Sequence, residues 1–310
     1  MANIDPNPSS PAANLDSGYV VDGTKILSRP IAAGLHITAT PIGNLGDITL
    51  RALNTLAAAD LILCEDTRIS SRLLQRYQIN TPMKPYHDHN GARVRPKIVA
   101  DIKAGKAIAL ISDAGTPLVS DPGFKLVQEL RDSDLPVHMS PGVSAPVMAL
   151  ALCGFPSDRF QFCGFLPPKS AARCHSLAEA GEYPGVSLFF ESPKRLEKCL
   201  ADAAKVIPDA RIAVARELTK QYEEVMRGTA SELLEIIKQR AGVKGEITLA
   251  IWPGAGKTVE IDDDQVSAAL NIAVQSMPAA KAALEVAKQF GLQKRQLYDM
   301  AVKIKNAAKK

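Results

Sequence analysis

The segment Ile111-Ser-Asp-Ala-Gly-Thr-Pro-Leu-Val-Ser-Asp-Pro-Gly123 is the most specific motif of this chain. It continues the apolar run Ala107–Ser112, which is typical of a buried strand, and it precedes Phe124–Arg131, whose apolar residues recur at helical spacing. The segment therefore connects a strand to a helix through two turns rich in Gly and Pro. Small residues in such turns let a ligand approach backbone N–H and C=O groups closely, so the segment is either a binding loop or a plain structural turn.

The same alternation of strands and helices extends in both directions from this segment. Short apolar runs predict strands at Leu35–Thr40, Leu61–Cys64, Ala107–Ser112 and Pro136–Met139. Helical spacing predicts helices at Ile48–Ala59, with Asp47 as its N-cap, and at Ile69–Tyr77, Val94–Lys103, Phe124–Arg131 and Ser144–Cys153. Because this alternation is typical of parallel strands joined by crossover helices, we expect an N-terminal α/β domain at residues 34–154.

A second α/β domain is predicted at residues 155–256, after a turn at Gly154-Phe-Pro-Ser157. Its expected strands are Phe160–Phe165, Val186–Phe190, Arg211–Ala215 and Glu246–Trp252. Its expected helices are Ser170–Ala180, Lys194–Val206 and Ser231–Arg240. The predicted fold class is thus α/β, with two α/β domains and a small helical appendage.

The two ends of the chain differ from this pattern. Residues 1–33 contain four prolines and little periodicity, so we expect a disordered N-terminal extension outside the fold. Residues 260–310 are Ala-rich and predict three helices, at Asp264–Gln275, Pro278–Phe290 (ended by Gly291) and Gln293–Ala308. From Ser276 onward, eight basic residues face two acidic ones, a net charge of +6 within a chain whose total is +4. The positive charge is therefore a local property of this appendage.

The overall composition excludes several classes of protein. Hydrophobic residues make up 46% of the 310 residues and charged residues 23%, which are values of an ordinary globular chain. No apolar stretch is long enough to cross a membrane. The five cysteines are odd in number and form no C-x-x-C pair, and no secretory signal is present, so we expect a reduced, cytoplasmic setting.

Three further motifs are weaker indications of function. The segment Ile251–Thr258 ends in Gly-Lys-Thr, but Ile251 replaces the first glycine of a phosphate-binding loop, which favours a linker. Pro41-Ile-Gly-Asn-Leu-Gly-Asp47 follows a strand as a dinucleotide-binding turn does, yet lacks the leading G-x-G. His87 and His89 diverge on a strand and no cysteine cluster assists them, so we expect no metal. The chain also has no G-x-S-x-G nucleophile motif.

Nine motifs in order resemble the tetrapyrrole-methylase superfamily and, within it, the bacterial 16S ribosomal RNA (cytidine-2′-O)-methyltransferases. The resemblance runs from about Leu35 to Trp252. In the N-terminal half the motifs are Thr40–Asp47, Glu65-Asp-Thr-Arg68, Tyr86-His-Asp-His-Asn90, Ser112-Asp-Ala-Gly-Thr-Pro117 and Pro141-Gly-Val-Ser-Ala145. In the C-terminal half they are Gly164-Phe-Leu-Pro167, Phe190-Glu-Ser-Pro193, Arg216-Glu-Leu-Thr-Lys220 and Lys244-Gly-Glu246.

This resemblance implies that S-adenosylmethionine binds in the cleft between the two α/β domains. The residues that it assigns to the cofactor come from both domains: Pro41, Gly43, Asp113, Ala114, Gly115, Thr116, Pro117, Ser144, Ala145, Phe190, Ala215, Arg216 and Glu246. Thr116 departs from the Asp of the broader superfamily, which puts a carboxylate contact at that position in doubt.

The function that the resemblance implies is 2′-O-methylation of a cytidine ribose in 16S ribosomal RNA of the small subunit, by a homodimer that binds neither DNA nor membranes. The residues expected to face the substrate, as catalytic candidates, are Glu65, Asp66, Arg68 and His87, although each could equally be a structural partner. A methyltransferase acting on a tetrapyrrole or another small substrate is the alternative. A non-catalytic RNA-binding or ribosome-assembly factor is a third.

Overall fold

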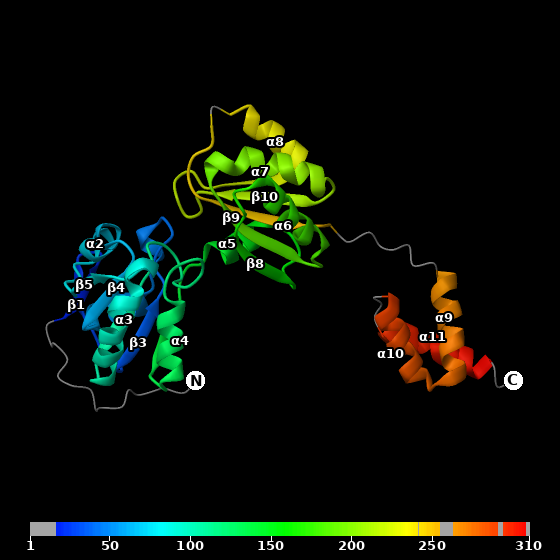
Figure 1. The fold of residues 1–310 in the computed structure, drawn as a ribbon, viewed down its shortest axis with the longest axis horizontal. Coiled ribbons are helices and arrows are strands. Elements are labelled where there is room, and N and C mark those ends of the chain that lie inside the picture. The colour runs from blue at the N-terminus through cyan, green and yellow to red at the C-terminus, as the bar shows by residue number, and fades with distance from the viewer. Residues whose placement is uncertain (1–16, 241, 255–262, 291–293, 308–310) are drawn as a thin grey trace. The chain divides into compact units, whose positions relative to one another are not determined.

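The computed structural model describes residues 17–240, 242–254, 263–290 and 294–307. The chain divides into two compact units, Met1–Pro253 and Gly254–Lys310 (Figure 1), which are described separately. The Gly-Lys-Thr sequence that ends at Thr258 and the helix end predicted at Gly291 lie outside the described residues.

The first sheet is entirely parallel, with strand order β5-β4-β6-β3-β7. Its strands are β3 (Gly34–Thr38), β4 (Leu61–Cys64), β5 (Met83–Pro85), β6 (Ala107–Leu110) and β7 (Val137–Ser140). The chain leaves β3 toward β4 on one side and leaves β6 toward β7 on the other. The gap between the carboxyl ends of β3 and β6 is therefore the switch point of the sheet, where α/β folds bind ligands.

Helices cover both faces of this sheet (Figure 1). One face packs against α1 (Leu50–Ala58) and α2 (Thr67–Arg76), and the other against α3 (Asp88–Lys103) and α4 (Phe124–Asp132). Thr49, rather than the predicted Asp47, caps α1, because its hydroxyl oxygen accepts from the Ala52 N–H at 3.1 Å. Asp47 instead belongs to a 3-10 turn, Leu45–Asp47.

We expected residues 1–33 to be disordered, but the structure shows a folded segment from residue 17 onward. β1 (Gly18–Val21) and β2 (Thr24–Leu27) form an antiparallel hairpin. Tyr19 is only 5% exposed and packs into the core beneath α1 and α2. The hairpin turns at Asp22 and Gly23, both with positive φ (47° and 79°), and an Asp-Gly pair between strands is a strong hairpin signal.

The second sheet is mixed, with strand order β11-β10-β12-β9-β8. Its strands are β8 (Phe160–Phe165), β9 (Val186–Glu191), β10 (Arg211–Arg216), β11 (Glu224–Gly228) and β12 (Ile247–Trp252). Only the β8–β9 pair is parallel. One face packs against α6 (Ser170–Glu182), α7 (Pro193–Val206) and α8 (Ala230–Lys238).

The other face of the second sheet packs against α5 (Ala145–Cys153). We expected this helix to complete the N-terminal domain, but Ala149, Leu150 and Cys153 pack among Leu188, Ala213 and other residues of the second sheet. The helix is apolar on nearly every side, so its sequence pattern gives no sign of which sheet it covers. The other residue boundaries of the two domains stay predictions.

The second unit consists of α9 (Asp263–Ser276), α10 (Ala279–Phe290) and α11 (Lys294–Ala307), packed around a small apolar core of their own. The expected three helices are therefore confirmed. Within the described part of the chain, no helix is long and apolar enough to span a membrane.

Candidate active site

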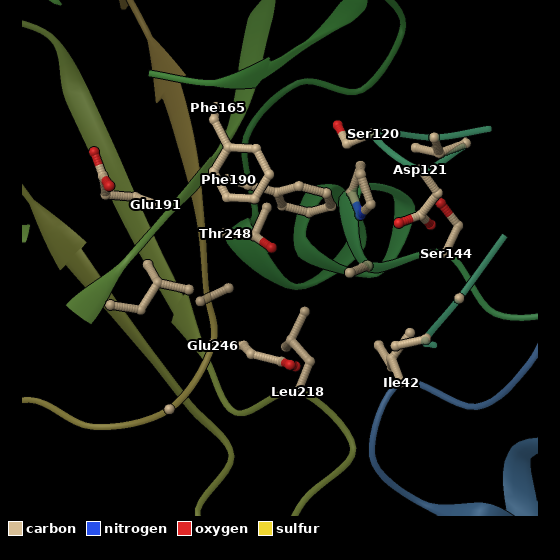
Figure 2. Close-up of a pocket in the computed structure, with 18 of the residues that line it drawn as sticks. Ile42, Ser120, Asp121, Ser144, Phe165, Phe190, Glu191, Leu218, Glu246 and Thr248 are labelled. Carbon is tan, nitrogen blue, oxygen red and sulfur yellow. The ribbon is translucent and has the colours of Figure 1, made fainter. Parts of the chain in front are cut away.

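A cavity of about 390 Å³ lies where the carboxyl edge of the first sheet meets the second sheet. Its wall on the first-sheet side comes from the loops that follow β3 and β6 and from the start of α5; the opposite wall comes from β8, β9, β10, β12 and the segments beside them. Figure 2 shows Asp121 and Ser144 on the first side and Phe165, Phe190 and Thr248 on the other. The volume is typical of pockets for small ligands and cofactors.

Gly115 fixes the loop after β6 against the loop after β3. Its N–H donates to Thr40 O at 3.0 Å, and its own carbonyl accepts from the Thr40 N–H at 2.8 Å. The φ of Gly115 is +78°, and a Cβ at this position would lie 3.2 Å from the Ile42 side chain, which also lines the cavity. Thr116 then binds the segment before α5, because its hydroxyl donates to Val143 O at 3.0 Å. The first wall is thus held mainly by backbone hydrogen bonds.

The loop continues through two residues in the left-handed region that are not glycine, Leu118 (φ 72°) and Ser120 (φ 67°). Such conformations are uncommon for side chains with a Cβ and cluster at functional sites. They shape the path that brings Ser120 and Asp121 to the cavity.

Asp121 is the carboxyl group whose protonation this environment changes most clearly. Burial is the main cause that raises the pKa of Asp121 to about 6. The negative charges of Glu65 and Asp113 also raise it, whereas the neighbouring Ser112 hydroxyl lowers it.

Aromatic rings and charged side chains form the wall of the second sheet. The rings of Phe165 and Phe190 lie with their centroids 5.4 Å apart, and Phe165 is 61% exposed. Glu191 is fully buried and accepts from the Arg195 guanidinium at 2.9 Å. Glu246, at the mouth of the cavity, pairs with Lys220 at 3.1 Å.

The two walls are tied together beside Leu218, which lines the cavity. The Asn44 N–H donates to Thr219 Oγ1 at 3.1 Å, and the side chain of Lys220 lies so close to Gly43 that a Cβ there would be 2.5 Å from Lys220 Cγ. The loop after β3 and the loop after β10 therefore meet at the cavity rim.

Most of the residues predicted to bind the cofactor line this cavity: Asp113, Ala114, Gly115, Thr116, Ser144, Ala145, Phe190, Ala215 and Glu246. Pro41, Gly43, Pro117 and Arg216 are not among the lining residues. The Arg216 side chain instead donates to Glu224 Oε2 at 3.3 Å and to Lys244 O at 3.1 Å. Their roles as cofactor ligands stay predictions.

The four predicted substrate-facing residues lie outside the cavity lining. Asp66 is the N-cap of α2 and also pairs with Arg68 at 2.6 Å, and this hydrogen-bonded pair lowers the pKa of Asp66 to about 2. Arg68 has a side chain that is 88% exposed. His87 is the N-cap residue of α3. Glu65 joins β4 to α2 and acts on Asp121 by its charge.

The sequence reasoning missed several lining residues, including Ile42, Ser120, Asp121, Phe165, Glu191, Leu218 and Thr248. Asp121 belongs to the second turn of the segment Ile111–Gly123, so its place in a Gly- and Pro-rich loop after a parallel strand was a usable signal. Among the residues that the structure describes, no three His, Cys, Asp or Glu side chains are grouped to hold a metal ion.

Comparison with known proteins assigns this fold to a class. A family model described as Tetrapyrrole (Corrin/Porphyrin) Methylases matches residues 34–234. Diphthine synthase is similar in structure, with a TM-score of 0.56 and 12% identity over 70% of this chain and 89% of that one. Cobalt precorrin-4 methyltransferase gives a TM-score of 0.53 and 15% identity over 70% of this chain and 93% of that one. The fold and the match place the chain in the tetrapyrrole methylase family.

Closer relatives narrow the class. "Ribosomal RNA small subunit methyltransferase I" of Mesorhizobium japonicum is 45% identical over 93% of this chain and 98% of its own length. The protein of the same name from Haemophilus influenzae is 42% identical over 86% of this chain and 96% of its own. A model described as the RsmI C-terminal HTH domain matches residues 260–305. The chain therefore belongs to the ribosomal RNA small subunit methyltransferase I family, and the prediction of a methyltransferase with this fold is confirmed.

Proposed function

We propose that this chain transfers a methyl group from S-adenosylmethionine to the 2′-hydroxyl of a cytidine ribose in small-subunit ribosomal RNA. The observation that carries the proposal is the 45% identity, over 93% of the chain, to a relative named for methylation of this RNA. The cavity supports it, because it lies at the switch point of a methylase fold and is lined from both sheets.

The lining residues fit S-adenosylmethionine chemically. The flat adenine suits the aromatic side chains of Phe165 and Phe190, and the positively charged sulfonium suits a wall that carries Asp113 and Asp121. The bare Cα of Gly115 leaves room for a ligand close to the main chain. The cofactor supplies an electrophilic methyl group when it is bound.

The contribution of the protein to such a transfer is mainly positioning. Holding two reactants in near-attack geometry lowers a barrier by about 7–11 kcal/mol. The backbone bonds between Thr40 and Gly115, and the Thr116 bond to Val143, hold the first wall in a fixed shape before any ligand enters. The tie between Asn44 and Thr219 fixes the distance to the second wall.

A stripe of arginines supports RNA as the substrate. Arg68, Arg72 and Arg76 follow one another at four-residue spacing on α2, so they share one face of the helix, and all three are exposed. The stripe begins beside the cavity, because the Asp66 N–H at the start of α2 donates to Asp113 Oδ1 at 3.1 Å. Exposed arginines in a row bind phosphates and position an RNA without reading its sequence.

The helical appendage is a second RNA-binding surface in this proposal. It carries the net charge of +6 between Ser276 and Lys310 and matches a helix-turn-helix family model, a motif that commonly binds nucleic acids. We further propose that the protein acts as a homodimer in the cytoplasm, where small ribosomal subunits are assembled.

The direct test is methyl transfer from labelled S-adenosylmethionine to small ribosomal subunits, followed by digestion of the RNA to nucleosides. The expected product is 2′-O-methylcytidine. Label on a tetrapyrrole offered in parallel, and none on RNA, would favour the alternative substrate. Binding to subunits without transfer would contradict the proposal.

The variant Gly115→Leu should lose cofactor binding, and it is compared with a matched control variant. A leucine at φ +78° would be strained and would fill space beside Ile42, so we expect loss of S-adenosylhomocysteine binding in calorimetry. Gly105→Leu, at a positive φ in open space, is the control for backbone strain alone. Equal affinity in folded Gly115→Leu protein would contradict the placement of the cofactor.

A further inference from the structure

Four carboxylates line the cavity, and three of them are already engaged by donors. Glu191 is held by Arg195 at 2.9 Å and also accepts from the Ser192 N–H at 2.6 Å. Glu246 pairs with Lys220. Asp113 accepts from the backbone N–H at the start of α2. These three side chains hold the walls of the cavity in place.

The fourth carboxylate, Asp121, differs from the others in its surroundings. No Lys, Arg or His nitrogen of the described ranges lies within 4.0 Å of its oxygens, and the Ser112 hydroxyl is the neighbouring group that lowers its pKa. In Figure 2 its carboxylate points into the cavity beside Ser144. Its loop is set by the left-handed residues Leu118 and Ser120.

We propose that Asp121 accepts the proton of the ribose 2′-hydroxyl during methyl transfer, an inference that rests on the proposed function. In this step the hydroxyl oxygen forms a bond to the methyl carbon while the methyl–sulfur bond breaks. The electron pair of the broken bond stays on sulfur, which becomes the neutral thioether of S-adenosylhomocysteine. The hydroxyl proton passes to Asp121, so atoms and charges balance.

The electrostatics of the site suit this role. A general base is most effective when its pKa lies near the working pH, and the pKa of Asp121 is raised to about 6 by burial. The groups that face it from its own side are Glu65, Asp113 and Ser112. Across the cavity, Glu191 and Glu246 are each paired with a cation. Near pH 7 Asp121 is therefore mostly ionised and ready to take a proton.

The experiment compares Asp121→Asn, Asp121→Glu and Asp113→Asn with Asp132→Asn, which removes an exposed carboxylate at the end of α4. Single-turnover methyl transfer to small subunits is followed between about pH 5 and pH 8.5. Calorimetry with S-adenosylhomocysteine gives cofactor affinity separately, and carbonyl ¹³C NMR of aspartate-labelled protein follows the Asp121 carboxyl directly.

We expect Asp121→Asn to slow methyl transfer by about 10²–10⁴-fold and to remove the fall in rate below about pH 6. S-adenosylhomocysteine affinity should stay within about threefold of the wild type, less than 1 kcal/mol. Asp121→Glu should recover part of the rate, and a carboxyl resonance that titrates near pH 6 should vanish in Asp121→Asn.

Three results would overturn the inference: a wild-type rate in Asp121→Asn, a cofactor affinity that falls as far as the rate, or loss of the acid limb in Asp113→Asn instead. A wild-type enzyme that transfers no methyl group to subunits would contradict the proposed function itself, and it would be seen before any variant is compared.

Discussion

Replacing Asp121 by Asn should make the protein more stable near neutral pH. The rise in the pKa of Asp121 from 3.8 to about 6 means that ionising this group in the folded state is unfavourable. At 1.36 kcal/mol for each pKa unit, the penalty is about 3 kcal/mol, and the half-buried position of the side chain reduces it to about 1–1.5 kcal/mol through solvent screening. Asn keeps nearly the same shape but carries no charge.

The stabilisation expected from Asp121→Asn depends on pH in a definite direction. Because the folded-state pKa is the higher one, the group favours folding below about pH 4 and loses that contribution as the pH rises through about 6. The gain from Asp121→Asn should therefore be complete at about pH 7.5 and fall to about one third at about pH 4.5.

Differential scanning calorimetry of Asp121→Asn and of the exposed control Asp132→Asn provides the measurement. For a unit of this size, about 1 kcal/mol raises the midpoint by about 2–4 °C. An Asp121→Asn protein that is no more stable than the wild type at about pH 7.5, or equally stabilised at about pH 4.5, would refute the reasoning.

Three other outcomes can be checked. Tyr19→Ala should lower the free energy of unfolding, measured by urea denaturation, by about 3 kcal/mol, because Tyr19 is buried in the core. The exposed Thr24→Ala should change this free energy little. Equal effects of the two substitutions would contradict the packing of the hairpin. Charge reversal of Arg72 and Arg76 to Glu should weaken binding to small subunits and leave S-adenosylhomocysteine affinity unchanged. The slope of log affinity against log salt concentration should fall by about 2. The exposed Lys198→Glu on α7 is the control, and an equal loss of subunit affinity in that variant would argue against the stripe as an RNA-binding surface. Deleting residues 260–310 should leave cofactor binding intact but lower subunit affinity at about 150 mM salt, and undiminished binding would assign the appendage another role.

Local sequence pattern predicted most of the regular elements. The strands β4 and β8 have the predicted bounds, because each is a short apolar run between polar or turn residues. Two of the missed strands, β5 and β11, lack such a run. β5 contains Lys84 and ends at Pro85 on the edge of its sheet, and β11 includes Glu224 and Arg227 at an edge of the other. Edge strands face water on one side and so carry a weaker apolar signal.

The candidate site was predictable only where neighbouring residues form it. Gly115 and Thr116 lie in one turn after one strand, and the turn itself identifies a binding loop. Phe165 and Thr248, by contrast, reach the cavity from strands at different positions in a mixed sheet whose order no local pattern gives. Asp121 needed a further step, because its raised pKa depends first on burial in the folded chain and then on the charge of Glu65, which comes from a different strand-to-helix connection.

The packing of α5 on the second sheet has a consequence for synthesis of the chain. The helix is complete at Cys153, but the strands that cover its apolar surface end only at Trp252. At roughly 5–20 residues per second, the ribosome needs roughly 5–20 s to make the intervening hundred residues. During that interval α5 is a hydrophobic helix without its complete sheet, and the cavity, which β12 helps to line, cannot form. Apolar surface exposed in this way is what chaperones generally bind, and the cofactor can assist folding only after the last strand has emerged.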